Sequence, residues 1–412
     1  MERRVDLAVI GGGASGMAAA IAAGRLGDRV AVFESAPRPC RKLLASGNGR
    51  CNLMNTGNPR YFGDAAFASS VLSHAGCDTV RGLMDSLGVL LVPEEDDRVY
   101  PATGQSSTVA DALKNGLKSV SAGFFPNAEI RRVSRVPDGF TLVRDGEKCH
   151  TARVLVACGG PASPRLGGTE SGYDILRSFG HRIIDPRPAL CPLTTDRKSV
   201  SGLSGIRVRC AVTLADPSGR PIHREQGEVL FTDYGVSGIC VMQCARFLPE
   251  GPCVLELDLI SRFFPEEEAL SRELHARRER FGDASPEALL NGILLPKLSY
   301  AVLKQAGIPL RGERLSDLDD RALSSVASVL RRYRLNVTGT RGLDAAQVTA
   351  GGADCREFCP STMESLLVPG LYASGEVLDV DGDCGGFNLL FAFSSGILAG
   401  ANGRDLKGVV IP

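Results

Sequence analysis

The sequence predicts an α/β fold in which one α/β domain is interrupted by a second, β-rich unit. Three observations lead to this prediction. A glycine cluster follows the first apolar run, the pattern of the chain changes near Pro186 and Pro188, and apolar runs ending in glycine return after residue 345. The predicted boundaries are 1–188 and 345–412 for the first domain, 189–260 and 334–344 for the inserted β domain, and 261–333 for a helical lobe.

The first 35 residues predict a strand, a glycine turn, a helix and a second strand, at 5–10, 11–16, 17–26 and 29–33. The turn has the spacing G-x-G-x-x-G, which brings bare backbone and a helix N-terminus close to a pyrophosphate. Glu34 ends the second strand, where a carboxylate can accept hydrogen bonds from ribose hydroxyls. The unit therefore predicts a dinucleotide site. Its acid disfavours NADP, whereas FAD and NAD both stay open. The candidate contacts are Gly11, Gly13, Ala14, Ser15, Gly16, Glu34 and Ser35.

Residues 37–52 predict a loop that wraps a ligand, since they hold four cationic side chains and few apolar anchors. Arg and Lys can neutralise a pyrophosphate, and Asn can bond the edge of a heteroaromatic ring. A solvated basic loop is the alternative. The candidate contacts here are Arg41, Lys42, Leu43, Ser46, Gly47, Asn48, Arg50, Cys51 and Asn52.

The remainder of the first part predicts further helices and strands. Residues 94–97 are four consecutive acids and predict a solvated turn. A strand at 128–136 brings the backbone of Val133 within reach of an adenine. A buried strand ends at Ala157, Gly159 and Gly160, where backbone can pass close to a nucleotide. Helices are predicted at 64–73, 78–87, 106–122 (with Ser106 or Ser107 as cap) and 173–179, a strand at 89–92, and a hairpin at 140–151 that turns at Asp145-Gly146.

The middle of the chain has a short, antiparallel pattern. Apolar and polar residues alternate along 208–214, which predicts a half-buried strand. Further strands at 228–232, 254–259 and 334–338 predict a small barrel or a sandwich. Helices are predicted at 239–245, 266–281, 285–291, 296–305 and 316–332, of which the last is the longest and has Ser316 as its cap.

The last segment resumes the pattern of the opening, with glycine-ended apolar runs at 348–352 and 371–376. A helix at 388–402 follows a glycine pair, so a second helix N-terminus is directed at the cofactor. Such a helix stabilises the negative charge of a reduced flavin, which an NAD enzyme does not need, so this segment favours FAD. Glu376 or Asp379 can bond the ribityl hydroxyls. The candidate contacts are Gly375, Glu376, Asp379, Gly385, Gly386, Asn388 and Leu389.

Composition limits the partners. Lys plus Arg and Asp plus Glu each number 47, which gives no electrostatic reason to expect nucleic acid or anionic lipid. No apolar run has the length of a membrane span, and Met1 leads directly into the first strand, so we expect a cytoplasmic protein. The 13 cysteines lack a CxxC pair and predict reduced thiols without a metal site.

These segments together resemble a family of bacterial NAD(P)/FAD-dependent flavoproteins that includes aminoacetone oxidases and bile-acid 3-dehydro Δ4,6-reductases. The resemblance implies a glutathione-reductase-like FAD domain with an inserted barrel-like β domain and a helical lobe. Many members carry a histidine where this chain has Asp233, Tyr234 and Ile239, so a role of that histidine cannot be transferred. The matching motifs are Gly11–Gly16, Lys42-Leu43-x-x-Ser46-Gly47-Asn48-Gly49-Arg50-Cys51-Asn52, Ala157–Gly160, Phe231-Thr232-x-x-Gly235-x-Ser237-Gly238, Val348–Gly352 and Gly375-Glu376-Val377-Leu378-Asp379-x-x-Gly382-x-x-Gly385-Gly386-x-Asn388.

We therefore expect an FAD-dependent oxidoreductase in which flavin N5 exchanges a hydride with a small or sterol-like substrate. Asp233 and Tyr234 are candidate groups on the substrate side, although an ordinary turn explains them equally well. A second G-x-G-x-x-G unit is missing, which favours NAD(P)H as a transient donor, an external donor or oxygen. The alternatives are an amine oxidase that uses oxygen and a flavin redox sensor without turnover. Substrate, electron donor, general acid or base, and oligomeric state stay open.

Overall fold

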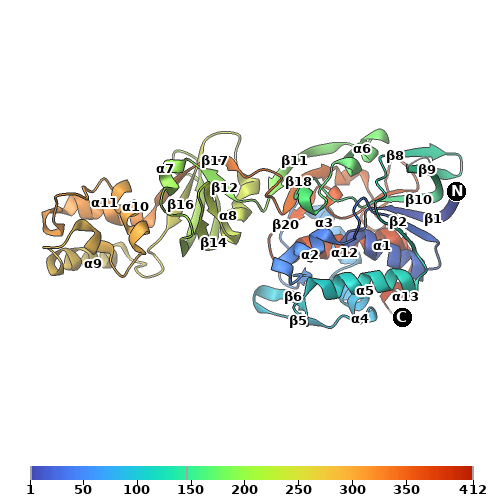
Figure 1. Cartoon of the computed structure of the whole chain (residues 1–412), viewed down its shortest axis with the longest axis horizontal. Coiled ribbons are helices and arrows are strands. Elements are labelled where there is room, and N and C mark those ends of the chain that lie inside the picture. Colours follow the sequence, from blue (N-terminus) through green and yellow to red (C-terminus); the bar gives the residue numbers. More distant parts are fainter. Residues whose placement is uncertain (1, 145–146, 411–412) are drawn as a thin grey trace. The chain divides into compact units, whose positions relative to one another are not determined.

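The computed structural model describes residues 2–144 and 147–410, and its contacts divide the chain into two compact units. The first unit consists of Met1–Ala189 and Leu343–Pro412, and the second of Leu190–Gly342. The outer boundaries predicted from the sequence, after residue 188 and before residue 345, lie one and two residues from this division. Both ends of the chain therefore belong to one unit (Figure 1).

A mainly parallel sheet forms the centre of the first unit, with the strand order β7-β2-β1-β10-β9-β8. β1 lies between β2 and β10 and is parallel to both, while β19, from the last segment, pairs in parallel with β10. The predicted α/β fold of Rossmann type is thereby confirmed. The strands are β1 (Glu2–Ile10), β2 (Val30–Phe33), β7 (Gly123–Phe125), β8 (Arg132–Val136), β9 (Gly139–Arg144), β10 (Glu147–Val156) and β19 (Leu371–Ala373).

The long helix α12 (Phe387–Ala401) packs along α1 (Ala14–Arg25), which follows the first strand (Figure 1). The contact is close because α12 has glycine where it crosses α1. A Cβ on Gly396 would lie 2.2 Å from the carbonyl oxygen of Ser15, and one on Gly400 would lie 2.2 Å from that of Ala19. The other helices of this unit are α2 (Arg41–Ala45), α3 (Ala65–His74), α4 (Cys77–Ser86), α5 (Ser106–Ser119), α6 (Ser171–Ser178) and α13 (Lys407–Val410).

Three small sheets complete the first unit. Two of them pair a strand from the first segment with a strand from the last segment, and the third is formed within the first segment alone. They are β3 (Met54–Asn55) with β6 (Arg98–Pro101) and β5 (Leu91–Pro93), β4 (Tyr61–Gly63) with β20 (Val380–Gly382), and β11 (Ile183–Ala189) with β18 (Val348–Ala353). β18 is thus antiparallel to β11 and lies outside the central sheet.

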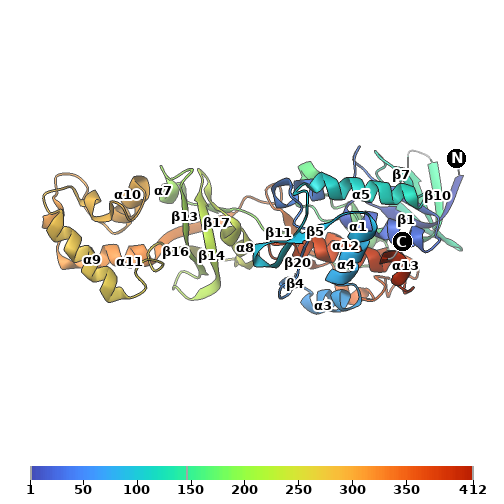
Figure 2. The same cartoon turned by 90° about the horizontal axis from the view of Figure 1, so that it is seen from below.

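The second unit is a closed antiparallel barrel with the order β12-β15-β14-β13-β16-β17. The sequence left a barrel and a sandwich open, and closure comes from the pairing of β12 with β17. Helices α9, α10 and α11 lie together beyond the barrel strands in both views (Figure 2). The elements are β12 (Leu193–Thr195), β13 (Arg207–Ala215), β14 (Pro221–Phe231), β15 (Gly235–Ser237), β16 (Cys253–Asp258), β17 (Tyr333–Thr340), α7 (Arg197–Val200), α8 (Ile239–Cys244), α9 (Glu267–Arg280), α10 (Pro296–Gln305) and α11 (Asp320–Arg331).

Several predicted elements differ from the structure. The predicted loop at 37–52 contains the short helix α2 and a 3₁₀ turn, Ser46–Gly49. Ser106 does not cap α5, because its hydroxyl donates to the carbonyl of Leu44 at 2.8 Å. The helix predicted at 316–332 is broken into a 3₁₀ turn and α11, which is capped by Asp319. The hairpin turn predicted at 145–146 lies outside the described residues.

Candidate dinucleotide-binding site

The three motif glycines of the turn between β1 and α1 have different surroundings. Gly11 has a φ of 111°, and a Cβ there would lie 2.3 Å from the Ala157 carbonyl oxygen. A Cβ on Gly16 would lie 2.0 Å from the Gly11 carbonyl oxygen, so helix and strand can meet only without one. At Gly13, the N-cap of α1, no described residue places an atom within 4 Å of the Cβ position. Bare backbone with uncapped N–H groups therefore faces open space, as an anion site requires.

Glu34 is held rigidly at the end of β2. Its Oε2 accepts from the backbone N–H of Gly12 at 2.7 Å, and its Oε1 accepts from Ala36 N at 2.7 Å. The Ser35 hydroxyl donates to the same Oε1 at 3.3 Å. Charge-assisted bonds of this kind fix the carboxylate beside the glycine turn, with lone pairs left for ribose hydroxyls.

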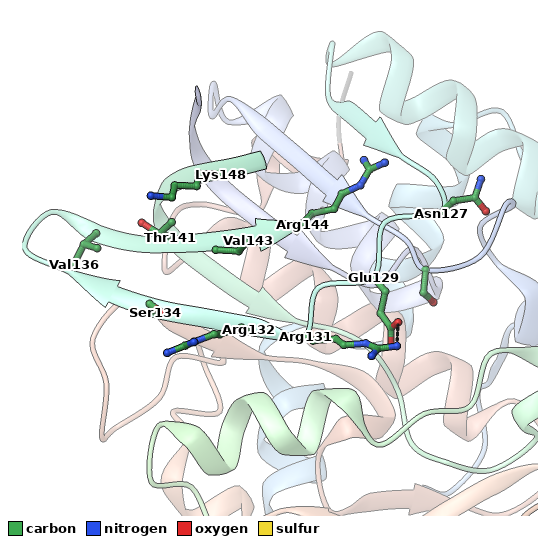
Figure 3. Close-up of a pocket in the computed structure, with 11 residues that line it drawn as sticks. Asn127, Glu129, Arg131, Arg132, Ser134, Val136, Thr141, Val143, Arg144 and Lys148 are labelled. Atoms are coloured by element: carbon green, nitrogen blue, oxygen red, sulfur yellow. Dashed lines mark hydrogen bonds and ion pairs between the residues drawn. The ribbon is translucent and has the colours of Figure 1, made fainter. Parts of the chain in front are cut away.

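A surface pocket of about 950 Å³ is lined mainly by side chains of β8 and β9 (Figure 3). Ser35, next to Glu34, is also among its lining residues. Val133, the predicted adenine contact, has a buried side chain, while its neighbours Arg132 and Ser134 line the pocket. β8 ends the sheet, so half of its backbone groups are not used by β9. A contact between Val133 and an adenine stays a prediction, and its buried side chain does not line this pocket.

The basic loop meets the last segment of the chain through one ion pair. Lys42 Nζ lies 2.9 Å from Glu376 Oε2, and Glu376 Oε1 accepts from Thr349 N at 3.0 Å. Both charged side chains are only partly exposed. Two candidates that are 334 positions apart in the sequence are thus side by side in the fold.

Other candidates of this loop have different surroundings. Leu43 and Cys51 are buried, and burial raises the pKa of the Cys51 thiol to about 12. Arg41 donates to the carbonyl oxygen of Arg165, close to Gly167. Ser46 Oγ donates to the carbonyl oxygen of Leu43 at 2.7 Å. Gly47 and Asn48 are both left-handed, with φ of 56°.

Asn52 and the glycine pair at the start of α12 face each other. A Cβ on Gly386, the N-cap of α12, would lie 2.5 Å from Met54 O and 2.8 Å from Asn52 Oδ1. Asn52 Oδ1 is buried and has no hydrogen-bond partner within the described chain. Buried polar atoms are usually hydrogen-bonded, so this oxygen is a candidate acceptor for a ligand.

Asn388 and Asp379 contact backbone. The Asn388 amide exchanges two hydrogen bonds of 2.8 Å with the backbone of Gly382, and so fixes the loop that precedes α12. A Cβ on Gly63 would lie 2.7 Å from Asp379 Oδ1. Leu389 is partly buried in the first turn of α12.

Tyr173 on α6 is a further candidate, which the sequence analysis did not name. Its hydroxyl is buried without a hydrogen-bond partner in the described residues, and burial raises its pKa. A Cβ on Gly160 would lie 3.0 Å from this hydroxyl and 2.5 Å from Thr349 Oγ1. The glycines before Tyr173 were a usable signal, but a single tyrosine on the buried face of an amphipathic helix is usually a core residue.

The first and last segments meet again at Ser15. A Cβ on Gly375 would lie 2.7 Å from Ser15 Oγ, and the Gly375 N–H donates to Ser395 Oγ at 3.0 Å. Gly375 has a φ of 74°, which favours glycine. The start of α1, the basic loop and the last segment therefore line one continuous region of the first unit.

The family follows from a comparison with known proteins. Residues 5–402 match the model of the HI0933-like protein Rossmann domain. The chain belongs to this family. It is 35% identical over 403 residues, covering 96% of this chain and 98% of the relative, to a 3-dehydro-bile acid delta(4,6)-reductase of Clostridium scindens. It is 30% identical over 404 residues, 95% of this chain and 96% of the relative, to a ribosomal RNA dihydrouridine synthase of Escherichia coli.

Among solved structures, a quinol–fumarate reductase with menaquinol covers 98% of this chain and 71% of its own, with a TM-score of 0.51 at 14% identity. This likeness concerns the fold alone. Membership of the HI0933-like family confirms the resemblance drawn from the motifs.

The second unit of this family member contains the other two candidates. Tyr234 lies under the guanidinium of Arg341, whose Cζ is 4.5 Å from the ring centroid, and its carbonyl accepts from Thr195 N at 3.1 Å. Asp233 is exposed. These contacts are those of a barrel turn, and a role for either residue on the substrate side stays a prediction.

Three findings concern other classes of site. Within residues 2–144 and 147–410, no group of three or more His, Cys, Asp or Glu side chains is arranged to hold a metal ion. In the same part of the chain, none of the helices has the length and apolar character to cross a bilayer. None of the cysteines in this part of the chain forms a disulfide.

Proposed function

We propose that this chain is an FAD-dependent reductase of carbon–carbon double bonds conjugated with a carbonyl group. The names of the relatives support this proposal. One relative is named for reducing the Δ4 and Δ6 bonds of a 3-dehydro-bile acid, and another for making dihydrouridine in ribosomal RNA. Both names describe hydrogen addition to a double bond that a neighbouring carbonyl polarises. When bound, reduced FAD supplies the hydride for such a reaction from N5.

The proposed cofactor contacts divide by the part of FAD that they meet. The N–H groups at the start of α1 bind the pyrophosphate, and Glu34 binds the adenosine ribose. Lys42 adds a positive charge near the phosphates, and Glu376 accepts from ribityl hydroxyls. The set also includes Gly11, Gly13, Ala14, Ser15, Gly16, Ser35, Arg41, Leu43, Ser46, Gly47, Asn48, Cys51, Asn52, Val133, Ala157, Gly159, Gly160, Gly375, Asp379, Gly385, Gly386, Asn388 and Leu389, and the backbone of Arg50.

The start of α12 stabilises the ring end of the cofactor. Gly386 caps this helix without a side chain, so its first N–H groups are available to a ligand. The helix dipole favours negative charge there, as a reduced ring system requires. Asn52 Oδ1, which has no partner in the described residues, can accept from a ring N–H. The same reasoning adds Tyr173, whose hydroxyl can donate to the cofactor.

The observation that carries the proposal is the convergence of both chain ends on one region through Lys42 and Glu376. We would purify the protein, measure its flavin content and follow the flavin absorbance without oxygen as NADH or NADPH is added. The reduced protein is then mixed with a steroid 4-en-3-one acid, a uridine-containing RNA or an amine. Rapid bleaching followed by reoxidation with a conjugated substrate is expected. Bleaching by the amine alone indicates an oxidase, and no response to any of them indicates a redox sensor.

RNA is the second candidate substrate. Equal numbers of basic and acidic side chains predicted no nucleic-acid partner. Two relatives that are 30% identical along nearly the whole chain are nevertheless named for a ribosomal RNA. Both candidates are anions, because a bile acid carries a carboxylate and RNA carries phosphodiesters. We therefore propose both substrate classes, and the reoxidation test above distinguishes between them.

A further inference from the structure

The four acids at residues 94–97, expected to be a solvated turn, contact two arginines. Glu94 Oε1 lies 2.5 Å from Arg50 Nη2, and Asp96 Oδ2 lies 3.4 Å from Arg98 Nη2. The turn is closed by a 2.7 Å hydrogen bond from Glu94 N to the Arg98 carbonyl. We call residues 94–97 the acidic turn.

The acidic turn is tied to the start of α12 by a single side chain. Asn55 Nδ2 donates to the carbonyl oxygens of Asp96, at 3.1 Å, and of Gly385, at 3.0 Å. A Cβ on Gly385 would lie 3.8 Å from Arg98 Nε. Burial raises the pKa of the neighbouring Cys384 thiol, and the positive charge of Arg98 opposes this rise. Arg98 is therefore next to the loop that we assign to the flavin ring.

Arg50 contacts the acidic turn through Glu94. Its guanidinium carbon lies 4.3 Å from the centroid of the Tyr100 ring, which orients the group by stacking. The basic loop was expected to direct this charge at the pyrophosphate, but the guanidinium is turned to Glu94 and Tyr100.

The two ion pairs are exposed and the turn is strained. The exposed fractions of the side chains are 46% for Arg50, 41% for Glu94, 30% for Arg98 and 74% for Asp96. Exposed pairs of this kind contribute little free energy. Asp96 and Asp97 are both left-handed, with φ of 58°, a conformation that side chains other than glycine rarely adopt. An incoming anion therefore needs little free energy to displace Glu94 and Asp96 from the two arginines.

We propose that Arg98 and Arg50 bind the anionic group of the substrate, a carboxylate or a phosphate, and that Glu94 and Asp96 occupy these arginines until it arrives. The planar guanidinium matches both anions, because each can accept two parallel N–H bonds. This inference rests on the proposed function, since it takes the start of α12 as the ring end of FAD. It adds the class of substrate and a competition between the acidic turn and that substrate.

The test uses the FAD-bound protein and measures binding without turnover. Cholate serves as the steroid carboxylate and uridine monophosphate as the phosphate, each titrated while the flavin absorbance is recorded. Methyl cholate and uridine are the uncharged counterparts. We expect the charged probe of at least one pair to bind roughly tenfold more tightly than its counterpart, since a charge-assisted hydrogen bond is lost without the charge.

Two kinds of variant separate this proposal from a structural role. Arg98→Gln and Arg50→Gln should each lower the affinity for the charged probe by roughly tenfold and leave the affinity for the uncharged probe unchanged. Asp96→Asn and Glu94→Gln should raise the affinity for the charged probe about twofold to fivefold, because each removes a carboxylate that competes with the probe for an arginine. Arg29→Gln is the matched control, since Arg29 pairs with Asp6 at 2.8 Å just before β2 of the same unit.

The outcomes are decisive in both directions. Binding of cholate alone or of uridine monophosphate alone supports the proposal and identifies the source of the anion. The proposal is overturned if neither probe changes the flavin spectrum, if Arg98→Gln and Arg50→Gln weaken charged and uncharged probes equally, or if Asp96→Asn weakens the charged probe. Failure of the proposed function looks different, because the anion then binds while no conjugated double bond is reduced.

Discussion

At the scale of single residues, the candidate site depends on carboxylates whose positions are fixed by backbone donors. Glu34 accepts from Gly12 N and Ala36 N, and Glu376 accepts from Thr349 N. Because each acid is already oriented before a ligand binds, little side-chain entropy is lost on binding. The two acids thus mark the predicted adenosine and ribityl ends of one extended cofactor.

Glu34→Gln should weaken FAD binding by roughly tenfold to a hundredfold, because a charged acceptor for ribose hydroxyls becomes a neutral amide. The measurement is the quenching of FAD fluorescence as apoprotein is titrated. Glu273→Gln is the control, since Glu273 lies on α9 of the second unit and pairs with Arg277 at 2.7 Å. Equal affinities of the wild type and Glu34→Gln would contradict the assignment.

Thiol reactivity should follow burial and local hydrogen bonding. Burial raises the pKa of the Cys51 thiol to about 12, so it stays protonated and unreactive at pH 8. At Cys359, slight burial acts upward, but hydrogen bonds from Ser361 and Thr362 dominate and lower the pKa. Because the thiolate fraction grows as pH rises through the pKa, iodoacetamide should label Cys359 at lower pH than Cys51. Mass spectrometry over pH 6 to 9 measures this, and earlier labelling of Cys51 would show the order to be wrong.

At the scale of elements, local patterns predicted the β1–α1–β2 unit well and several boundaries poorly. Gly11 and Gly16 are required by close backbone contacts, so their spacing alone was enough to predict this unit. Ser106 failed as a cap because its hydroxyl bonds Leu44, a partner 62 positions away. Asn52 was a candidate from its loop motif, whereas Tyr173 became a candidate only through its neighbours Gly160 and Thr349, which are distant in sequence. Barrel closure by β12 and β17 is equally non-local.

Gly400→Ala in α12 should destabilise the fold by roughly 2 kcal/mol or more, because its methyl group would overlap the Ala19 carbonyl oxygen. Helix propensity alone predicts the opposite sign, about 1 kcal/mol of stabilisation. Urea unfolding measures the difference. Gly251→Ala, at a position with nothing within 4 Å of the Cβ, should leave stability nearly unchanged. A stabilised Gly400→Ala protein would mean that α12 does not pack closely on α1.

At the scale of the whole molecule, the chain leaves the first unit and returns to it at neighbouring points. Ala189 in β11 is the register partner of Val348 in β18, six residues after the second unit ends at Gly342. Strands paired in this way lie about 5 Å apart, so a short linker can close the gap. The insertion therefore interrupts the sequence without interrupting the first unit.

Replacing residues 190–342 by a Gly-Ser linker of about six residues, a length that spans this gap, should leave a folded protein that still binds FAD. Reduction of the conjugated substrate should be lost if the second unit supplies substrate contacts. Flavin content after purification and circular dichroism test the first statement, and anaerobic reoxidation tests the second. A colourless, unfolded product beside a yellow full-length protein would show that the first unit depends on the insertion.

The pairing of β19 with β10, together with α12 lying along α1, also constrains biosynthesis. On the ribosome, the edge of β10 at Val154–Val156 has no partner until residues 371–373 emerge, when nine-tenths of the chain has already been translated. The barrel is complete by Thr340 and can fold in the meantime, because domains fold as units during synthesis. We expect cofactor loading to follow chain release, and a nascent chain stalled before residue 371 to expose an edge strand prone to aggregation.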